Sequence, residues 1–596
     1  MTLFSVAFVG GTVRAGAYRY YDGAEKKSNG DFIYSLIENE VILLKAEDKD
    51  YTGKTFVFPA EIDGKKVIGA GYGLLDCLRS SGNADTITSI KVEEGVEKIA
   101  ECDTDEEEEY EFDPGNFFVF AGLKNLKEVS LPSTLKRLDR GLFYNCESLK
   151  KIYVPDSVTE SDRSVFENCT SLEEVRLSKN LTKISDSMFR NCTAIKKIKI
   201  PDGVTFISAS AFENCKSLEG KFRLPKSLES MWNNPFLGCN KIDGFRIDKS
   251  NGRYTVKGGV LFSKNMEYLC CYPIGKKTKE YKLPSDVVYV ADKAFFGAKY
   301  LEKVTLSDKT RSLGDSAFGN CKALKGKFGI SKKLKYVGWH VFAGSAGMTG
   351  FKIDKKNKHF SQIDGVLMSK DKKIIYGCLP SAKIKEFKVP STVKAVYDYA
   401  FAYTKKLEKV TFKKRCSLGN YLFANSNIKS VVFSDKNQNI GIGTFLNCKK
   451  LESANIPSET VYIKSNTFSG CKNLKSVKIP SGVYRIGSGA FRNCEKLKEI
   501  KLPSSLEIVG SEAFYGCDGI KSLTFPKKVD RIGKNAFADC KKLKTVRFNG
   551  ANVEIEENDL KGSGIVIYAA QSRYYRDSAK QLAKDNGLKF VTVKYN

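Results

Sequence analysis

Apolar residues recur along this chain with a fixed spacing of 23 residues. From Phe468 to Phe537 the sequence holds three tandem copies of one unit, FSGCKNLKSVKIPSGVYRIGSGA, FRNCEKLKEIKLPSSLEIVGSEA and FYGCDGIKSLTFPKKVDRIGKNA. Within a copy the apolar positions follow L-x-x-I-x-L, as at Leu497, Ile500 and Leu502. A fixed period of this size predicts a solenoid, in which each unit buries its apolar face only against its neighbours.

The phenylalanine that opens each copy marks sixteen units, and most steps between them are 22 to 24 residues. These anchors are Phe120, Phe143, Phe166, Phe189, Phe212, Phe236, Phe295, Phe318, Phe342, Phe401, Phe423, Phe445, Phe468, Phe491, Phe514 and Phe537. Two steps, those ending at Phe295 and Phe401, are 59 residues long. Residues 189–294 and 295–400 therefore form a 106-residue super-repeat, in which FRIDKSN is echoed by FKIDKKN and GVLFSK by GVLMSK.

Each long unit is expected to contain a β-hairpin. The apolar runs are Val260–Phe262 and Tyr268–Tyr272 in the first copy, and Val366–Met368 and Ile374–Tyr376 in the second. Because the whole block is duplicated, the insert indicates an architectural module; a catalytic graft would be expected once. In the unit that begins at Phe212, one extra residue precedes the strand beside Gly220, which predicts a β-bulge.

The two ends depart from the repeat, as the terminal units of a solenoid should, because the last apolar face needs cover. Residues 18–86 predict an N-terminal β cap, with a hairpin centred on residues 38–40 and a turn at residues 63–64. Residues 549–596 predict a C-terminal cap. Its elements are a helix with Tyr575, Ala579, Leu582 and Ala583 on one face, a stop at Gly587, and a strand over Leu588–Val593.

Between the caps, repeats are expected over 87–235, 236–400 (with the two inserts) and 401–548. The acidic insertion 103–113 could bind a hard cation such as calcium through its carboxylates, but its residue order matches no EF-hand loop, so a solvated loop is the favoured interpretation. Residues 1–17 resemble the back half of a secretory signal peptide, with an apolar run and an A-x-A site but no basic start. No later apolar run approaches the ~18 residues that span a bilayer.

Several motifs together resemble the BspA-like leucine-rich repeat family of bacterial surface proteins. They are the A-F-x-N-C turn, L-x-x-I-x-I-P, S-x-V-x-x-I, the GVLFSK insert and the N-terminal IDGKKV. The resemblance covers the chain from about residue 32 onward and implies a β-rich leucine-rich repeat solenoid. It further implies a secreted or surface-exposed protein that acts in adhesion.

The composition of the chain shows two further features, a net positive charge and cysteines that recur at one position of the repeat. Lys and Arg number 98 against 69 Asp and Glu, a net charge of +29, which favours an anionic partner. Eleven of the 17 cysteines share one phase of the repeat and are expected to be buried thiols, since free Cys packs as a small hydrophobe. They are Cys146, Cys169, Cys192, Cys215, Cys239, Cys321, Cys448, Cys471, Cys494, Cys517 and Cys540.

Catalytic and metal-binding chemistry finds no support in the motifs. The chain has two histidines, His340 and His359, whose counterparts in the first super-repeat are Asn234 and Arg253. A packed or surface role is the expectation for His340, beside the turn at residues 339–342. No G-x-S-x-G, H-E-x-x-H, Walker or C-x-x-C motif occurs. We therefore predict no enzyme, no cofactor and no metal site.

A binding surface is predicted from strand geometry instead. If Ile500 and Leu502 face the core, Lys501 faces outward, because alternate side chains of a strand point to opposite sides. The same outward position in other repeats gives two basic sectors, whose candidate binding residues are Arg176, Lys199, Arg223, Lys478, Lys501 and Arg547. The sparse aromatic residues of this column argue against single-stranded nucleic acid. The expected partner is an extracellular-matrix or cell-surface protein or an anionic glycan; the alternative is a structural spacer with no ligand.

Overall fold

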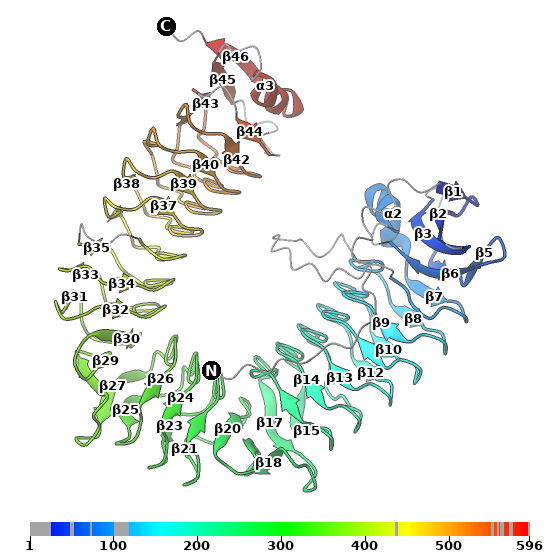
Figure 1. Ribbon diagram of the computed structural model, residues 1–596, viewed down its shortest axis with the longest axis horizontal. Coiled ribbons are helices and arrows are strands. Elements are labelled where there is room, and N and C mark those ends of the chain that lie inside the picture. The colour runs from blue at the N-terminus through cyan, green and yellow to red at the C-terminus, as the bar shows by residue number, and fades with distance from the viewer. Residues whose placement is uncertain are drawn as a thin grey trace. The chain divides into compact units, whose positions relative to one another are not determined.

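The computed structural model describes residues 26–37, 39–47, 53–71, 74–100, 118–434, 439–549, 553–556, 560, 565–570 and 576–593. The chain forms two compact units, residues 1–264 with 272–276, and residues 265–271 with 277–596. In both, successive 23-residue turns stack so that their short strands run parallel and side by side (Figure 1). The predicted solenoid is confirmed.

The first row of strands contains the L-x-x-I-x-L segments. In the first unit it comprises β4 (Thr55–Phe58), β7 (Ser89–Val92), β8 (Glu128–Ser130), β10 (Lys151–Tyr153), β12 (Glu174–Arg176), β15 (Glu219–Arg223) and β17 (Lys241–Arg246). In the second unit it comprises β21 (Glu280–Lys282), β23 (Lys303–Thr305), β25 (Gly326–Ile330), β27 (Met348–Ile353), β31 (Glu386–Val389), β33 (Lys409–Phe412), β35 (Ser430–Val432), β36 (Ser453–Asn455), β38 (Ser476–Lys478), β41 (Ser522–Phe525), β43 (Thr545–Phe548), β45 (Val566–Ala570) and β46 (Lys589–Val593).

The second row consists of two-residue strands on the other side of each turn. In the first unit they are β9 (Arg137–Leu138), β11 (Glu160–Ser161), β13 (Lys183–Ile184), β14 (Phe206–Ile207) and β16 (Ser230–Met231). In the second unit they are β22 (Tyr289–Val290), β24 (Ser312–Leu313), β26 (Tyr336–Val337), β32 (Ala395–Val396), β34 (Ser417–Leu418), β37 (Tyr462–Ile463), β39 (Arg485–Ile486), β40 (Ile508–Val509), β42 (Arg531–Ile532) and β44 (Glu554–Ile555).

The anchor phenylalanines form the spine of the core. Phe143 and Phe491 are fully buried, and each ring stacks on those of the preceding and following turns. Around Phe491 the centroid distances are 5.3 Å to Phe468 and 5.5 Å to Phe514, with the ring planes within 8° of parallel. One face of every turn is thus covered by the next turn, which is why the period in the sequence is so regular.

The cysteine column is buried and its thiols are free, as predicted. The structure adds the reason that a thiol suits this position. Each Sγ donates to the carbonyl oxygen of the phenylalanine one turn earlier, as Cys494 does to Phe468 at 3.2 Å and Cys517 to Phe491 at 3.1 Å. In one turn Ser345 replaces the cysteine and donates its hydroxyl to Phe318 in the same way. The carbonyl already accepts the backbone N–H three residues later, as Phe468 O does from Cys471 at 3.0 Å, so the thiol is a second donor that ties one turn to the next.

Two positions flanking most of the anchor phenylalanines have left-handed backbone. Two residues after the phenylalanine stand mostly Asn or Gly, the types that tolerate positive φ. The asparagines also bond along the array, since Asn168 donates to Asn145 at 2.7 Å and Asn191 to Asn168 at 2.6 Å. Two residues before it, the left-handed position holds Ser in three successive turns, at 164, 187 and 210.

Strands form at the apolar runs of both inserts. The first insert contains β18 (Tyr254–Lys257), β19 (Val260–Ser263) and β20 (Tyr268–Cys271), and the second contains β28 (Phe360–Ile363), β29 (Val366–Ser369) and β30 (Ile374–Cys378). In the second insert all three strands pair antiparallel in order. The predicted bulge lies between Gly220 and Lys221, with Gly220 at φ 73°, and the register shifts again at the equivalent Gly326.

The N-terminal segment forms a mixed sheet in the order β1 (Lys26–Ser28), β2 (Phe32–Ile37), β3 (Glu40–Ala46), β6 (Lys65–Ala70), β5 (Glu61–Ile62), followed by helix α2 (Asp76–Ser81) and the short 3-10 helix η1 (Asn83–Thr86). β2 and β3 form the expected hairpin, with Asn39 at φ 73° in its turn. β5 and β6 form the second hairpin around residues 63–64. That this sheet caps the array stays a prediction.

The C-terminal helix and strand also form where expected, as α3 (Arg576–Asp585) and β46. Ala579, Leu582 and Ala583 are buried along one face of α3, and Gly587 follows at φ 64°. β46 extends the sheet of β41, β43 and β45. The signal-peptide segment 1–17, the acidic insertion 103–113 and Tyr575 lie outside the described residues.

Candidate interaction surface

The strand face that the sequence predicts to point outward does so. In β10, Tyr153 is 46% exposed between the buried Ile152 and Val154. Five of the six candidate residues are exposed and Arg547 is half-buried. The first unit holds Arg176, Lys199 and Arg223, and the second holds Lys478, Lys501 and Arg547. Whether these residues bind a ligand stays a prediction.

In the first unit, carboxylates of the preceding turn accompany the basic column. Arg176 lies 3.6 Å from Asp156, which also pairs with Lys179 at 3.1 Å. Arg223 lies 3.1 Å from Asp202. These ion pairs are exposed and add little stability, but they reduce the positive potential of the column. These acidic partners lie one turn away from the basic residues, so the strand pattern of a single repeat does not reveal them.

A second outward column, three residues before the first, runs through the second unit and was missed. For most of its length it alternates in charge. Glu302 pairs with Lys279 at 3.6 Å and with Lys325 on its other side; Glu408 pairs with Lys429 at 3.0 Å; Glu452 pairs with Lys475 at 2.8 Å. The signal was present in the sequence as opposite charges spaced by one repeat.

The alternation stops after Lys475. The next three residues of the column are all exposed lysines, Lys498, Lys521 and Lys544. Backbone hydrogen bonds show that the turns stack here, since Lys498 N–H donates to Lys475 O at 3.4 Å and Lys544 N–H to Lys521 O at 2.9 Å. We call these three, with Lys478 and Lys501, the lysine patch. Within the described chain, no carboxylate lies within 4 Å of any of its ammonium groups.

Like charges on neighbouring strands repel one another, so an uncompensated column lowers stability. The only acidic residue in this part of the face is the exposed Glu499, between Lys498 and Lys501 in sequence, and it forms no ion pair among the described residues. The second column contributes three of the patch's five cations and so enlarges the basic sector predicted around Lys478 and Lys501. A polyanion laid across the turns could meet several of these charges at once.

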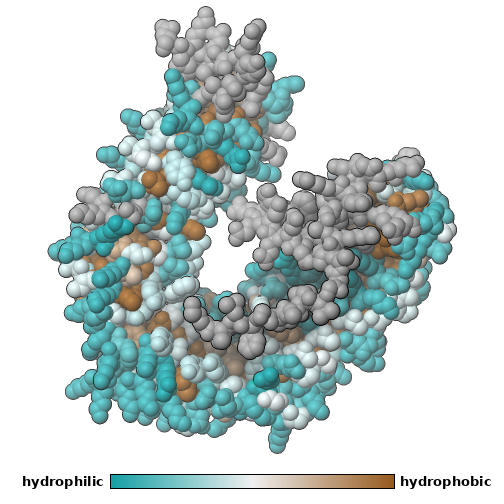
Figure 2. Space-filling model, in the orientation of Figure 1, coloured by the Kyte–Doolittle hydropathy of each residue, from teal (hydrophilic) through white to brown (hydrophobic). Residues whose placement is uncertain are grey.

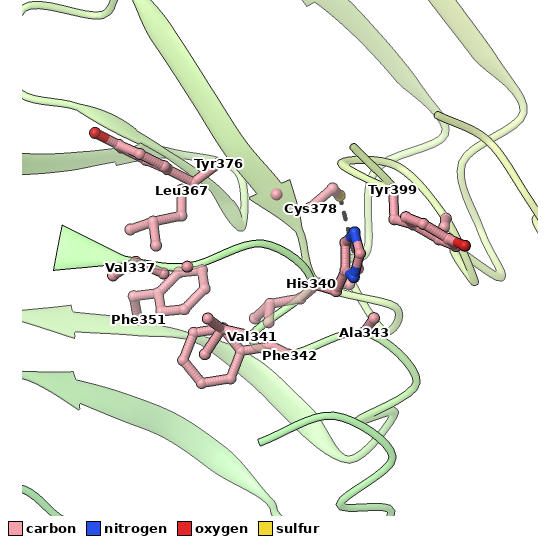
Figure 3. A pocket seen from close by; sticks show the side chains of 14 residues that line it. Val337, His340, Val341, Phe342, Ala343, Phe351, Leu367, Tyr376, Cys378 and Tyr399 are labelled. Carbon is pink, nitrogen blue, oxygen red and sulfur yellow. Dashed lines mark hydrogen bonds between the residues drawn. The ribbon is translucent and has the colours of Figure 1, made fainter. Parts of the chain in front are cut away.

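A small aromatic pocket lies elsewhere in the second unit, at the end of the second insert. Its cavity volume is about 30 Å³. Figure 3 shows His340 between Cys378 and Ala343, with Tyr399 beside it and Phe351 on the far side. The ring centroids of His340 and Tyr399 are 4.1 Å apart. His340, for which the sequence predicts a packed or surface role, is half-buried in the wall of this pocket.

The electrostatics of the pocket favour neutral groups. Burial lowers the pKa of His340, although the carboxylates of Asp398 and Asp315 act against this shift. Burial, together with the neighbouring Tyr421, raises the pKa of Tyr399 to about 12. At neutral pH the pocket therefore contains an uncharged imidazole and an uncharged phenol.

Four thiols of the cysteine column are poor nucleophiles. Burial raises the pKa of Cys146, Cys321, Cys448 and Cys540 to about 12, far above the range of reactive cysteines. Across the described residues, no three His, Cys, Asp or Glu side chains converge as a metal site would require. None of the described helices has the length and apolar character needed to cross a bilayer.

Among the described residues, the side shown in Figure 2 carries no single large apolar patch. Hydrophilic residues predominate there, and hydrophobic residues form small separate spots. A partner that binds through a broad apolar surface therefore has no support on this side. Binding through charged groups or through a small specific site is favoured instead.

Comparison with solved structures finds other repeat proteins. A leucine-rich cell surface protein from Faecalibacterium prausnitzii A2-165 is 19% identical, with 89% of this chain and 96% of that chain covered and a TM-score of 0.32. A leucine-rich repeat protein from Eubacterium ventriosum is 18% identical, with coverages of 80% and 96% and a TM-score of 0.36. The pneumococcal vaccine antigen PcpA is 15% identical, with coverages of 96% and 99% and a TM-score of 0.26.

No curated protein matches the chain. The family model described as BspA type leucine rich repeat region matches residues 116–243, 270–363, 372–483 and 461–572, which is well over half of the sequence. These matches span both units and include the stacked turns, the cysteine column and parts of both inserts. The chain belongs to the BspA-type leucine-rich repeat family.

Proposed function

We propose that this chain is an exported, surface-exposed interaction scaffold with an adhesin-like role. The scaffold is non-enzymatic. It binds a large acidic partner, such as a matrix or cell-surface protein or an anionic glycan. Membership of the BspA-type family supports the location and the scaffold role. The lysine patch is the observation that carries the choice of partner.

Three features support the patch as the binding surface. Its lysines are exposed on adjacent turns, so their spacing follows the stacking distance of about 4.8 Å between strands. In earlier turns of the second unit, the column that contains Lys498, Lys521 and Lys544 has its lysines paired with Glu302, Glu408 and Glu452. A general excess of lysine would leave unpaired lysines along the whole column, so it does not explain why they gather in the patch. Solenoids commonly bind partners on such an extended strand face.

The test is binding of the purified full chain to matrix proteins and sulfated glycans at low and physiological salt. The variant Lys478→Glu/Lys501→Glu/Lys521→Glu should weaken binding at least about tenfold, which is about 1.4 kcal/mol. The matched control Lys279→Glu/Lys303→Glu/Lys325→Glu changes the net charge equally, on the same strand face of the same unit, and should retain most of the affinity. Each control lysine has a carboxylate partner in the native chain.

Other outcomes would redirect the proposal. Equal losses in both triple variants, or binding that vanishes at physiological salt, would show that net charge alone is responsible. Complete absence of binding would favour the structural spacer. Native protein found in the cytoplasm with residues 1–17 retained would contradict export.

A further inference from the structure

The aromatic pocket breaks the pattern of the array in two ways. The first concerns the left-handed position two residues before each anchor phenylalanine. In three successive anchored turns this position holds His340, Tyr399 and Tyr421, at φ 53°, 55° and 52°, where most other turns have Ser, Asn or Gly. Bulky side chains seldom adopt this backbone, and such exceptions cluster at functional sites.

These three side chains form one continuous surface. Tyr399 stacks on Tyr421 with a centroid distance of 4.8 Å and an angle of 22°, and His340 meets the other side of Tyr399 edge-on. Tyr399 and Tyr421 are half-buried, so part of each ring faces solvent. The result is a flat, partly exposed tyrosine platform that leads into the cavity beside His340.

The second departure lies in the second insert. Where the first super-repeat has Cys271 and Tyr272, the second has Gly377 and Cys378. Tyr272 is 1% exposed, so the first copy fills this part of its structure with a phenol ring. In the second copy the smaller side chains of Gly377 and Cys378 line a cavity. The pocket thus distinguishes the second copy of the block from the first.

The dimensions and chemistry of the cavity limit what can enter it. About 30 Å³ holds a group of two or three heavy atoms and excludes a sugar or aromatic ring. Phe351, Leu367 and Val341 make one wall apolar. At the other wall the buried Nε2 of His340 has no hydrogen-bond partner among the described residues. A methyl group with an adjacent amide fits both walls, because a buried imidazole nitrogen needs a polar partner.

We propose that this site binds an N-acetylated hexosamine residue of a glycan. The acetyl group enters the cavity, with its methyl against Phe351 and Leu367 and its amide hydrogen-bonded to His340 Nε2, a buried atom that a small rotation of the imidazole presents to the cavity. The sugar ring lies on the platform of Tyr399 and Tyr421, since tyrosine offers a rigid apolar face with a polar tip. Asp315 and Asp398 are near enough to His340 to influence its pKa. Within the described structure each accepts only at Oδ1, from Trp339 N–H and Asn420 N–H, which leaves the second oxygen for a sugar hydroxyl.

The site is separate in residues and in chemistry from the lysine patch. It holds neutral aromatic groups and two carboxylates in place of lysines, so its binding should change little with salt. Failure of one proposal therefore leaves the other standing.

The test is titration of the full chain with N,N′,N″-triacetylchitotriose, followed by calorimetry and by saturation-transfer NMR. We expect saturable binding, the strongest transfer to the acetyl methyl, and at least about tenfold weaker binding of the matched glucose trimer cellotriose. Equal binding of the two trimers, or no binding of any N-acetylated probe, would overturn the proposal. Two further probes, an N-acetylgalactosaminyl-serine and a peptidoglycan disaccharide, distinguish a host O-glycan from a bacterial wall as the source.

The array itself supplies variants that should still fold. Tyr399→Asn places a residue common at left-handed positions on the platform, and Cys378→Tyr restores the residue of the first copy. Both should lose at least about tenfold in affinity with no loss of thermal stability. Lys293→Asn, the same change at the equivalent position of the first copy, should leave binding unchanged. If Cys378→Tyr does not fold, Tyr399→Asn decides; unaltered binding in that variant would contradict the proposal.

Discussion

Removing one ring from the phenylalanine spine should have a large effect confined to a few turns. In Phe491→Ala a fully buried ring disappears from between Phe468 and Phe514, which it contacts at 5.3 and 5.5 Å. Truncations of this kind cost about 3–5 kcal/mol, because the transfer free energy is lost and the cavity cannot collapse fully. Both neighbouring rings lose a partner, so relaxation of one turn cannot close the gap.

The loss must be measured locally, because an array of this length need not unfold in one step. Hydrogen exchange gives the opening free energy of individual amides. Amides of turns 468–514, such as Phe491 N–H, which bonds to Ala513 O at 2.8 Å, should lose about 3–5 kcal/mol of protection. Amides of the first unit, such as Phe166 N–H, should not change. The exposed control Lys496→Ala should stay within about 0.5 kcal/mol of the native chain.

Two results would refute this reasoning. A loss below about 1 kcal/mol at the neighbouring turns would mean that the ring does not fill the space between turns. An equal loss throughout both units would mean that the array opens as a single cooperative body, contrary to nearest-neighbour stacking.

Four further predictions concern other columns of the array. Cys494→Ser should keep the hydrogen bond to Phe468 O and remain near native stability, as Ser345 does in its own turn, whereas Cys494→Ala should lose about 1 kcal/mol by thermal denaturation. Buried thiols such as Cys146, whose pKa is raised to about 12, should resist alkylation at pH 8 until denaturant is added; rapid labelling of the native chain would contradict the burial of the column. Gly510→Ala should destabilise its turn by about 1–3 kcal/mol, because the added Cβ would lie 2.5 Å from Ser488 N, while Gly482→Ala, with open space around it, should be near neutral. The folded-state pKa of His340 lies below its unfolded value near 6.5, so the unfolded chain binds the proton more tightly; protection of the amides around the pocket should fall as pH drops below 6.5, and His340→Asn should abolish that dependence.

Which residues of each turn are buried could be predicted from the sequence, because every turn packs the same positions against the next turn. The anchors, the buried cysteines, the bulge at Gly220 and the hairpin strands of the second insert all follow from spacing and residue type. What the cysteine thiol does could not be predicted, since its acceptor is a backbone carbonyl one turn away whose direction depends on how the turns stack.

The candidate surfaces were harder to predict for a related reason. The neutralising Asp156 and Asp202 and the alternating Glu and Lys column involve residues separated by roughly one period, so they become evident only when neighbouring turns are compared at the same phase. His340, Tyr399 and Tyr421 also share one phase, two residues before an anchor. That signal was present, but the 59-residue step between two of them concealed that their turns are adjacent in space.

The duplicated 106-residue block gives the chain an unusual freedom to change. Each block begins on an anchor phenylalanine and ends directly before the next one, so a spare copy can be added without altering the contact surfaces at its boundaries. One copy can then keep a filled interior, as at the buried Tyr272. The other can carry smaller side chains that leave a cavity, as at Gly377 and Cys378. In such an architecture a new binding cavity can form when large side chains are replaced by small ones in one of the two copies. The packing of the other turns is then unaffected.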